Sequence, residues 1–208
     1  MNALAAAWPL PGFFSQDDRQ TSLRDSTNSE DAGLVAGARN GDEGAFEALV
    51  RRHKRRVLAA AARFARDDHQ LDDIAQEIFV RVYRNLGQYR GDAPFEHWLS
   101  RIIVSACYDF LRKERRQREQ VSLDGTERHI CDETIESSMA ARRAREFLQW
   151  GLRKLSADEQ LILTLCELEE RSVREVSELT GWSESNVKVR AFRARQNLKK
   201  ILETNHER

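Results

Sequence analysis

The chain has 208 residues, in which 34 lysines and arginines balance 34 aspartates and glutamates, so its formal net charge is +0. This length allows one ordinary domain or two small ones. A composition with 40% hydrophobic and 33% charged residues is too polar for a large β or α/β core, yet too apolar for a disordered chain. Because it holds 3 prolines and 10 glycines among abundant Ala, Leu, Glu and Arg, the composition favours helices.

Neither a membrane span nor a secretory signal is predicted. The apolar run at 57–62 is far shorter than the roughly 20 residues that a membrane-spanning helix needs. The apolar first 14 residues contain no Lys or Arg and are interrupted by two prolines, so they do not fit a signal peptide. Cys107, Cys131 and Cys166 are widely spaced and form no CxxC pair, which is typical of a reducing compartment. We therefore expect a cytoplasmic protein.

The charges are grouped in blocks. Residues 51–66 and 185–200 carry seven and six basic side chains without an acid, and residues 101–118 carry six basic and two acidic ones. Residues 67–77 and 121–137 are acidic. The distribution of charge, more than its sum, decides whether a chain binds nucleic acid. Each block taken alone also fits a solvated helix face.

A first helical bundle is predicted over residues 31–116. Residues 1–30 have no helical period and are rich in Ser, Asp, Gln and Thr after Phe14, so we expect a disordered tail. Asp31 is then expected to cap a short helix that ends before Asn40-Gly41. Three longer segments with apolar residues at the helical period of 3.6 follow, at about 42–66, 71–86 and 95–116.

A second helical bundle is predicted over residues 140–204. The segment 117–139 has weak periodicity and an acidic bias, which indicates a flexible linker and a domain boundary. No segment has the period of a β-strand. The predicted fold is therefore all-α, with two small helical domains, and the expected helices of the second domain are about 140–154, 158–168, 172–179 and 183–202.

Residues 172–202 fit a helix-turn-helix, in which Gly181 permits a left-handed turn residue. The second helix has an apolar back at 187, 191, 194, 198 and 201, and Val189 lies on its opposite face. A recognition helix needs this division, because its back packs on partner helices while its front reaches phosphates and base edges. An amphipathic surface helix with a solvated basic face is the alternative. The predicted DNA-contacting residues are Ser185, Asn186, Lys188, Arg190, Phe192, Arg193 and Gln196.

Three segments resemble, in order and spacing, motifs of the extracytoplasmic-function (ECF) sigma factors, the smallest members of the bacterial primary-sigma superfamily. Gly181-Trp182-Ser183 with residues 186–195 resembles the family's promoter-reading motif, and residues 72–79 (DDIAQEIF) resemble its core-polymerase-binding helix. The resemblance covers about residues 31–202. The third match, to the promoter-melting helix, consists of Phe95, Trp98, Leu99, Ile102, Asp109 and Arg112.

The resemblance implies an alternative sigma factor that binds core RNA polymerase and directs it to promoters. By this resemblance, residues 31–116 form sigma domain 2, which binds core and recognises and melts the minus-ten element, and residues 140–204 form sigma domain 4, which reads the minus-thirty-five element. Most family members are silenced by an anti-sigma protein, so we expect such a partner. An acidic linker folded onto helix 185–200 is the alternative mode of inhibition. The sequence departs from the family pattern at Ser105, Ser177, Asn186 and Val189.

The outward face of the predicted helix 71–86 mixes acid, amide and apolar groups. Such a face suits a protein partner better than DNA, because acids repel phosphates. By resemblance, that partner is the coiled coil on the clamp of the largest polymerase subunit. A solvated mixed-charge face is the alternative. The predicted polymerase-binding residues are Asp73, Gln76, Glu77 and Val80.

Basic and aromatic residues gather around the predicted helix 95–116. Basic groups track a nucleic-acid backbone while aromatic rings stack on unpaired bases. The loop 87–94 would help to hold a flipped base. Trp98, four residues before Ile102, is expected to be a core residue. The predicted minus-ten contacts are Tyr89, Arg112, Arg115 and Arg116.

No common catalytic motif occurs in the sequence, so we expect no enzyme, cofactor, metal or small-molecule substrate. His129 and Cys131 supply two zinc ligands where a site needs three or four. Two other functions stay open. A stand-alone helix-turn-helix transcription regulator would bind duplex DNA tightly without polymerase. A nucleic-acid-processing enzyme would need a carboxylate triad, for which the only candidates, at 67, 68, 72 and 73, fall on different helix faces.

Overall fold

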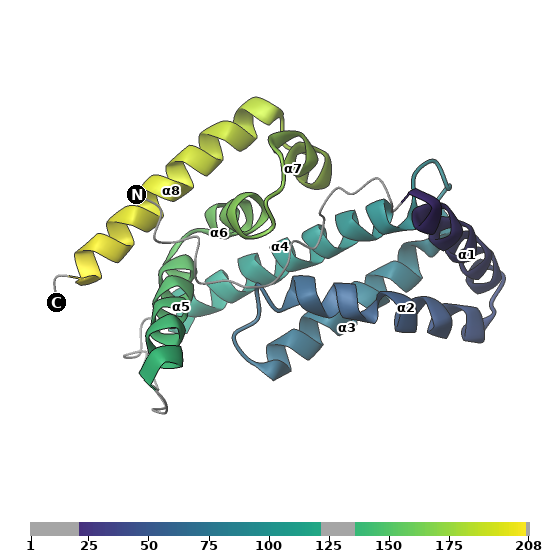
Figure 1. The fold of residues 1–208 in the computed structure, drawn as a ribbon, viewed down its shortest axis with the longest axis horizontal. Helices are drawn as coiled ribbons and strands as arrows, with labels where there is room; N and C mark the ends of the chain where they lie inside the picture. Colours follow the sequence, from purple (N-terminus) through teal and green to yellow (C-terminus); the bar gives the residue numbers. More distant parts are fainter. Residues whose placement is uncertain (1–20, 122–135, 207–208) are drawn as a thin grey trace. The chain divides into compact units, whose positions relative to one another are not determined.

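A computed structural model describes residues 21–121 and 136–206, and all regular structure in these ranges is helical (Figure 1). The all-α prediction is confirmed. The chain divides into two compact units, and the division falls between Leu111 and Arg112, inside the long helix α4 (Phe95–Val121). No helix in the described ranges is long and apolar enough to cross a membrane.

The first unit contains α1 (Thr21–Arg39), α2 (Glu43–Ala61), α3 (Asp68–Asn85), a short 3-10 turn (Leu86–Gln88) and the first part of α4. Asp42 caps α2 as expected, since its side chain accepts a hydrogen bond from the N–H of Ala45 at 3.1 Å. Asp67 was expected to end a helix that runs to residue 66. It instead caps the start of α3, accepting from the N–H of Gln70 at 2.8 Å, and α2 ends at Ala61.

Helix α1 begins at Thr21, so the prediction that residues 1–30 form a disordered tail is wrong for 21–30; residues 1–20 lie outside the described part. Asp31 lies within this helix and is 1% exposed. Its carboxylate is 3.2 Å from Nε2 of His53 and 3.0 Å from Nε of Arg52, both on α2. A buried carboxylate is tolerated when it is paired in this way. The tertiary partners on α2 thus hold a helix whose own sequence favours caps and turns.

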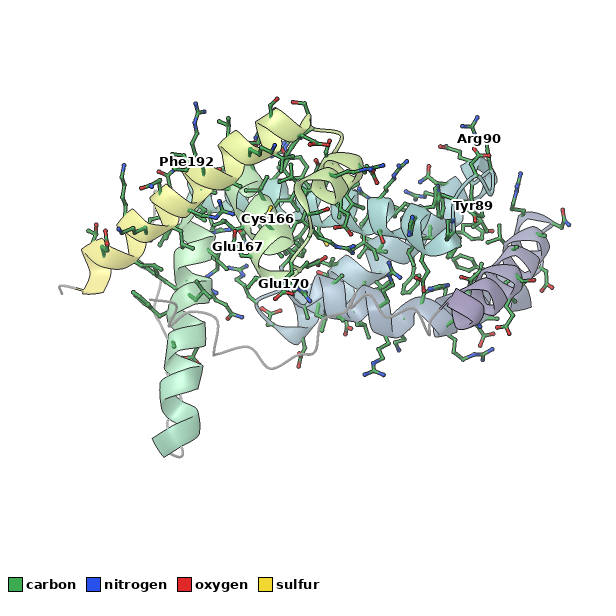
Figure 2. The ribbon with its side chains drawn as sticks, turned by 45° about the horizontal axis from the view of Figure 1, so that its top comes forward. Tyr89, Arg90, Cys166, Glu167, Glu170 and Phe192 are labelled. Carbon is green, nitrogen blue, oxygen red and sulfur yellow. The ribbon has the colours of Figure 1, made fainter. Side chains whose placement is uncertain are left out.

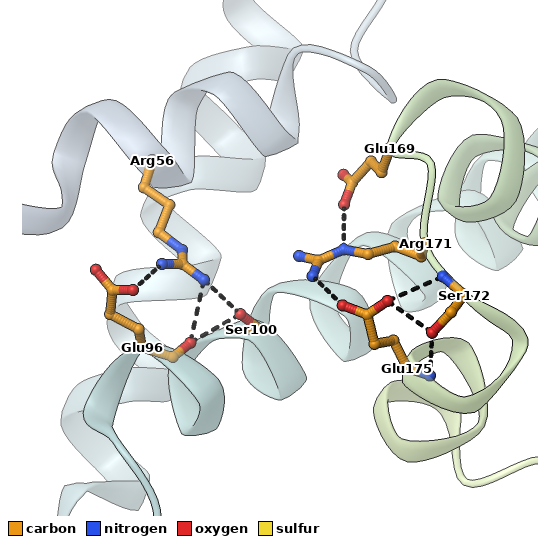
Figure 3. A network of polar contacts seen from close by, with 7 residues as sticks. All are labelled: Arg56, Glu96, Ser100, Glu169, Arg171, Ser172 and Glu175. Atoms are coloured by element: carbon orange, nitrogen blue, oxygen red, sulfur yellow. Dashed lines mark hydrogen bonds and ion pairs between the residues drawn. The ribbon is translucent and has the colours of Figure 1, made fainter. Parts of the chain in front are cut away.

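The core of the first unit lies between α2, α3 and the start of α4. Arg56 on α2 ties these helices together at the rim, with Nη1 2.7 Å from the Glu96 carboxylate and Nη2 donating to the Ser100 hydroxyl at 2.8 Å (Figure 3). Burying these apolar side chains supplies the main driving force for folding. The largest of them are Leu49, Val57, Ile74, Ile78, Val82, Phe95 and Leu99.

The predicted linker 117–139 is too long at both ends. Helix α4 continues to Val121, and α5 (Glu136–Lys154) begins before residue 140; residues 122–135 lie outside the described part. The stretch after residue 116 consists of Gln, Arg and Glu, which are good helix formers, so the helix has no local reason to stop there.

The second unit contains α5, α6 (Ala157–Leu163), a π-helical turn (Thr164–Leu168), α7 (Val173–Thr180) and α8 (Glu184–His206). Helices α5, α6 and α7 all pack against α8. Gly151 permits the close approach of α5 to α8, since a Cβ at this position would lie 2.7 Å from Cδ2 of Leu202. The core side chains of this unit are Leu155, Leu161, Ile162, Leu165, Val176, Val187 and Ala194.

Candidate nucleic-acid interface

Two capping boxes start the helices that precede α8. Ser156 and Glu159 at the start of α6 exchange hydrogen bonds, in which the serine hydroxyl caps the N–H of Glu159 and the glutamate accepts from the N–H of Ser156. Ser172 and Glu175 repeat the arrangement at the start of α7. These reciprocal bonds satisfy backbone donors that a helix leaves unpaired.

Hydrogen bonds keep both capping glutamates ionised. Burial alone would raise the pKa of Glu159, but bonds from the Ser156 hydroxyl and N–H and from Asn197, with the charge of Arg115, outweigh burial and lower that pKa. The pKa of Glu175 is lowered in the same way, against burial, by Ser172 and by Arg171, whose Nη1 lies 3.2 Å from its carboxylate (Figure 3).

The turn between α7 and α8 is fixed by four hydrogen bonds. Gly181 adopts a left-handed conformation with φ +76°, and its N–H donates to the carbonyl of Ser177 at 2.9 Å. The Ser177 hydroxyl donates to the Trp182 carbonyl at 2.6 Å. Thr180 Oγ1 accepts from the Trp182 N–H at 3.2 Å and donates to the Val176 carbonyl at 2.7 Å. Ser177, a departure from the family pattern, therefore fixes the angle at which α8 leaves the turn.

Helix α8 has two distinct faces, as its sequence period predicts. Val187 and Ala194 are fully buried, Ala191 is buried, and Leu198 and Ile201 are half-buried. The opposite face is open to solvent. Its exposed residues are Ser185, Lys188, Val189, Phe192, Arg193 and Gln196.

Two cations on the outward face of α8 are available for an external partner. Among the residues that the structure describes, none forms a side-chain hydrogen bond or ion pair with Lys188 or Arg193, and both are exposed. A free exposed cation carries no intramolecular cost when it moves onto a phosphate or a base edge. This face can therefore bind a polyanion.

Arg190 does not share this freedom. Its guanidinium lies over the Trp182 ring, 4.3 Å from the centroid, its Nε donates to Asn186 Oδ1 at 2.7 Å, and it forms an ion pair with Asp158 on α6. The prediction that Arg190 contacts DNA therefore needs correction, because its side chain is engaged within the unit. Asn186 is exposed, but its carbonyl oxygen is occupied by the same arginine.

A second arginine anchors α8 at the π-helical turn. Arg195 binds Glu167 through Nε at 2.8 Å and Nη2 at 2.6 Å, and the side-chain amide of Asn197 donates to Glu159 (Figure 2). Sequence reasoning missed these residues, because Arg195 looks like any other cation of a basic block. A lone acid at 167, between apolar residues and one helix away, was the available signal.

Helix α3 carries the predicted polymerase-binding row. Asp73, Gln76 and Glu77 are exposed and Val80 is half-buried, so all four lie along the outward side as predicted. Tyr83 extends this row and was missed. It is 63% exposed, and its ring meets Phe46 on α2 edge-on, with the centroids 5.0 Å apart.

Arg81 joins α3 to α4 beside this row. Its guanidinium contacts Glu77 at 2.6 Å and Asp109 at 2.7 Å. Desolvation would lower the pKa of Arg81, but the hydrogen bonds to Glu77 and Asp109 outweigh it and raise that pKa. Glu77 and Asp109 are thus committed to an internal contact.

The loop before α4 is built around Tyr89, which is buried. Its hydroxyl donates to the Ala93 carbonyl at 2.8 Å, and its ring packs against Phe95 and Trp98 with centroids 5.6 and 5.5 Å away (Figure 2). Burial, and then the charges of nearby aspartates, raise the pKa of Tyr89. The prediction that Tyr89 stacks on a base is therefore corrected, since its ring faces belong to this cluster and its role is to hold the loop.

The basic end of α4 is exposed at all three predicted minus-ten positions, Arg112, Arg115 and Arg116. These residues fall in the second unit, where Arg118 Nη1 donates to the Arg153 carbonyl at 2.6 Å. No group of three or more potential metal ligands occurs among the described residues. His129 and Cys131 lie outside them.

Comparisons with known proteins agree with these features. A family model described as Sigma-70 region 2 matches residues 49–117, and one described as Sigma-70, region 4 matches residues 151–198. The RNA polymerase sigma-H factor of Pseudomonas aeruginosa is 30% identical over 185 residues, covering 85% of this chain and 96% of the relative. The ECF sigma factor SigM of Mycobacterium tuberculosis is 30% identical over 196 residues, covering 93% and 90%. The chain belongs to the ECF sigma factors. It is an alternative sigma factor that directs transcription initiation.

Solved structures place this sigma factor among similar folds. The structure of CnrH in complex with the cytosolic domain of CnrY is similar, with a TM-score of 0.52 and 25% identity over 84% of this chain and 98% of that one. The sigma factor RpoE of Bartonella quintana, in complex with the anti-sigma factor NepR, has a TM-score of 0.52 at 17% identity over 76% and 96%. The latter likeness shows the fold alone.

Proposed function

We propose that this sigma factor reads the minus-thirty-five element of its promoters with the outward face of α8. The observation that carries the proposal is the division of this helix into a buried apolar back and an exposed front on which Lys188 and Arg193 are free. No acid occurs between Glu184 and Glu203, so nothing on this stretch repels phosphates. Ser185, Phe192 and Gln196 complete the contacting surface, and Arg190 positions it.

The same proposal assigns core RNA polymerase to α3. Asp73, Gln76, Glu77 and Val80 form the row that docks on the clamp of the largest subunit, and Tyr83 extends it. Exposed side chains of mixed chemistry beside an aromatic ring support a protein partner over DNA.

For the minus-ten element, we assign the backbone contacts to Arg112, Arg115 and Arg116. Their exposure on one helix supports this role. Tyr89 acts indirectly, since its hydroxyl and ring hold the loop 87–94 in which a flipped base would be bound. Residues 31–116 and 140–204 serve as the two functional domains.

The remaining assignments complete the proposal. The protein works in the cytoplasm, performs no chemistry of its own and needs no cofactor. An anti-sigma partner is supported by two similar sigma factors that were solved with partners bound, CnrH with CnrY and RpoE with the anti-sigma factor NepR.

Run-off transcription with purified core polymerase on genomic fragments tests this function. We expect specific transcripts that require both the protein and core, and that weaken with Arg193→Ala. The loss should be about 1–3 kcal/mol if Arg193 reads a base, and smaller and salt-dependent if it contacts phosphate. Lys54→Ala, which removes an exposed cation from α2, is the matched control.

Two results would contradict the proposal. Wild-type transcription by Arg193→Ala across a range of salt concentrations would show that the recognition face is misplaced. Tight specific binding to duplex DNA without core, and no transcripts with it, would favour a stand-alone helix-turn-helix regulator.

A further inference from the structure

Two large apolar side chains are exposed in the middle of the basic face of α8. Val189 is 48% exposed and Phe192 is 61% exposed, and they stand three residues apart. Phe192 is labelled in Figure 2 on the C-terminal helix. Side chains at this spacing are neighbours on one face of a helix. Leaving both in water carries a free-energy cost that a bound partner would recover.

The charges around this pair identify the kind of partner. Lys188 and Arg193 flank Val189 and Phe192 in sequence, both are exposed, and the nearest acids on the helix are Glu184 and Glu203. An apolar patch within an all-basic surface fits a polyanion that presents some apolar groups. It fits an apolar protein surface poorly, because the flanking cations would lose water without gaining partners.

In the major groove of DNA, the apolar group on a base edge is the 5-methyl group of thymine. We propose that Val189 and Phe192 form a methyl-reading pair that selects thymines in the minus-thirty-five element. This inference rests on the proposed function of α8 and specifies what that helix reads. Neighbouring side chains on a helix are about 5–6 Å apart, so the pair spans one or two base steps.

The pair is held firmly enough to discriminate. Val189 is β-branched and therefore has few side-chain conformations to lose. Arg190, the next residue, is fixed by Trp182 and Asp158, and Ala191 packs into the core. A rigid backbone under both side chains keeps their positions along the groove constant, which is what sequence discrimination requires.

The test uses holoenzyme assembled from the full-length chain and core polymerase. A library of promoter duplexes with a randomised minus-thirty-five element is selected for binding, and the bound sequences are read. Each thymine of the selected element is then replaced singly by deoxyuridine, which removes the methyl group and leaves the base-pairing edge intact. Binding of the paired duplexes is compared by competition.

We expect thymine to be enriched, and deoxyuridine to weaken binding about fourfold at each contacted position, the effect of losing one buried methyl group. Val189→Thr, which keeps the shape of the side chain, and Phe192→Ser should each reduce the thymine-to-deoxyuridine ratio at one position to near one. Val189→Ile is the matched control and should keep the ratio. Because the ratio is measured within each variant, a general loss of affinity does not obscure it.

Three results would overturn the inference while leaving the proposed function intact. These are a selected element without thymine, equal binding of thymine and deoxyuridine by the wild-type protein, and an unchanged ratio in both Val189→Thr and Phe192→Ser. Failure of the selection to enrich any sequence beyond core polymerase alone would instead count against the proposed function.

Discussion

The guanidinium of Arg190 lies over the indole ring of Trp182, 4.3 Å from its centroid, and pairs with Asp158 on α6. One side chain thus joins three parts of the helix-turn-helix: the start of α6, the turn and α8. Cation–π stacking of a partly buried arginine is worth about 1 kcal/mol, and the ion pair adds less. Arg190 thereby sets the angle of α8 rather than reading DNA itself.

Asp158→Ala discriminates between these two roles of Arg190. If Arg190 positions α8, removing its partner should lower the melting temperature by a few degrees and weaken promoter binding, although a negative charge has been removed. If Arg190 reads DNA, releasing it should strengthen binding. Thermal melting monitored by circular dichroism and holoenzyme binding to a promoter duplex measure both effects. Glu178→Ala, which removes an exposed acid from α7, is the control for charge alone.

Polymerase binding can be tested without disturbing internal contacts. Asp73→Ala combined with Gln76→Ala should weaken the affinity for core polymerase by about tenfold or more while leaving the thermal melt unchanged, because both side chains are exposed. Glu77 is unsuitable for this purpose, since its replacement would also release Arg81. Co-purification with core is the measurement, with Arg51→Ala on α2 as the control. Undiminished binding by the double variant would refute the docking assignment.

The backbone after the π-helical turn contains a strained residue. Glu170 has φ +52°, a left-handed conformation that costs a non-glycine residue about 1–2 kcal/mol. Glu170→Gly should therefore stabilise the protein by about 0.5–1 kcal/mol, after allowing for the greater chain entropy of glycine when unfolded. The melting temperature is expected to rise. Glu178→Gly, inside α7, should lower it, and a fall for both variants would contradict the prediction.

The two capping glutamates predict a loss of stability in acid. Their pKa values are lower in the folded protein than the ordinary value of 4.5, so the unfolded chain binds protons first as the pH falls. Their contribution is fully present at neutral pH and declines as the pH falls from about 4.5 through the lower folded values. Glu159→Gln and Glu175→Gln should each be destabilising at pH 7 and converge with the wild type in acid. Urea unfolding at a series of pH values measures this, and a constant difference at every pH would contradict it.

Local sequence determined the two helical domains, the helix-turn-helix and the two faces of α8. Apolar residues at the helical period on 187–201 fix which side is buried, and Gly181 supplies the left-handed turn residue wherever the helices pack. The outward row of α3 followed from the same period. These features depend on residues within a few turns of one another, so a linear pattern is enough to predict them.

Only the tertiary structure decided which polar and aromatic side chains are already occupied. Asp31 seemed a helix cap and is buried against His53, 22 positions away; Arg190 seemed a DNA contact and is held by Asp158, 32 positions away. Tyr89 seemed free to stack on a base and is enclosed by Phe95 and Trp98. A pattern of spacing reports the charge and direction of a side chain. Its partner comes from a distant segment brought near by packing, and that partner decides whether the side chain holds the fold or reaches outward.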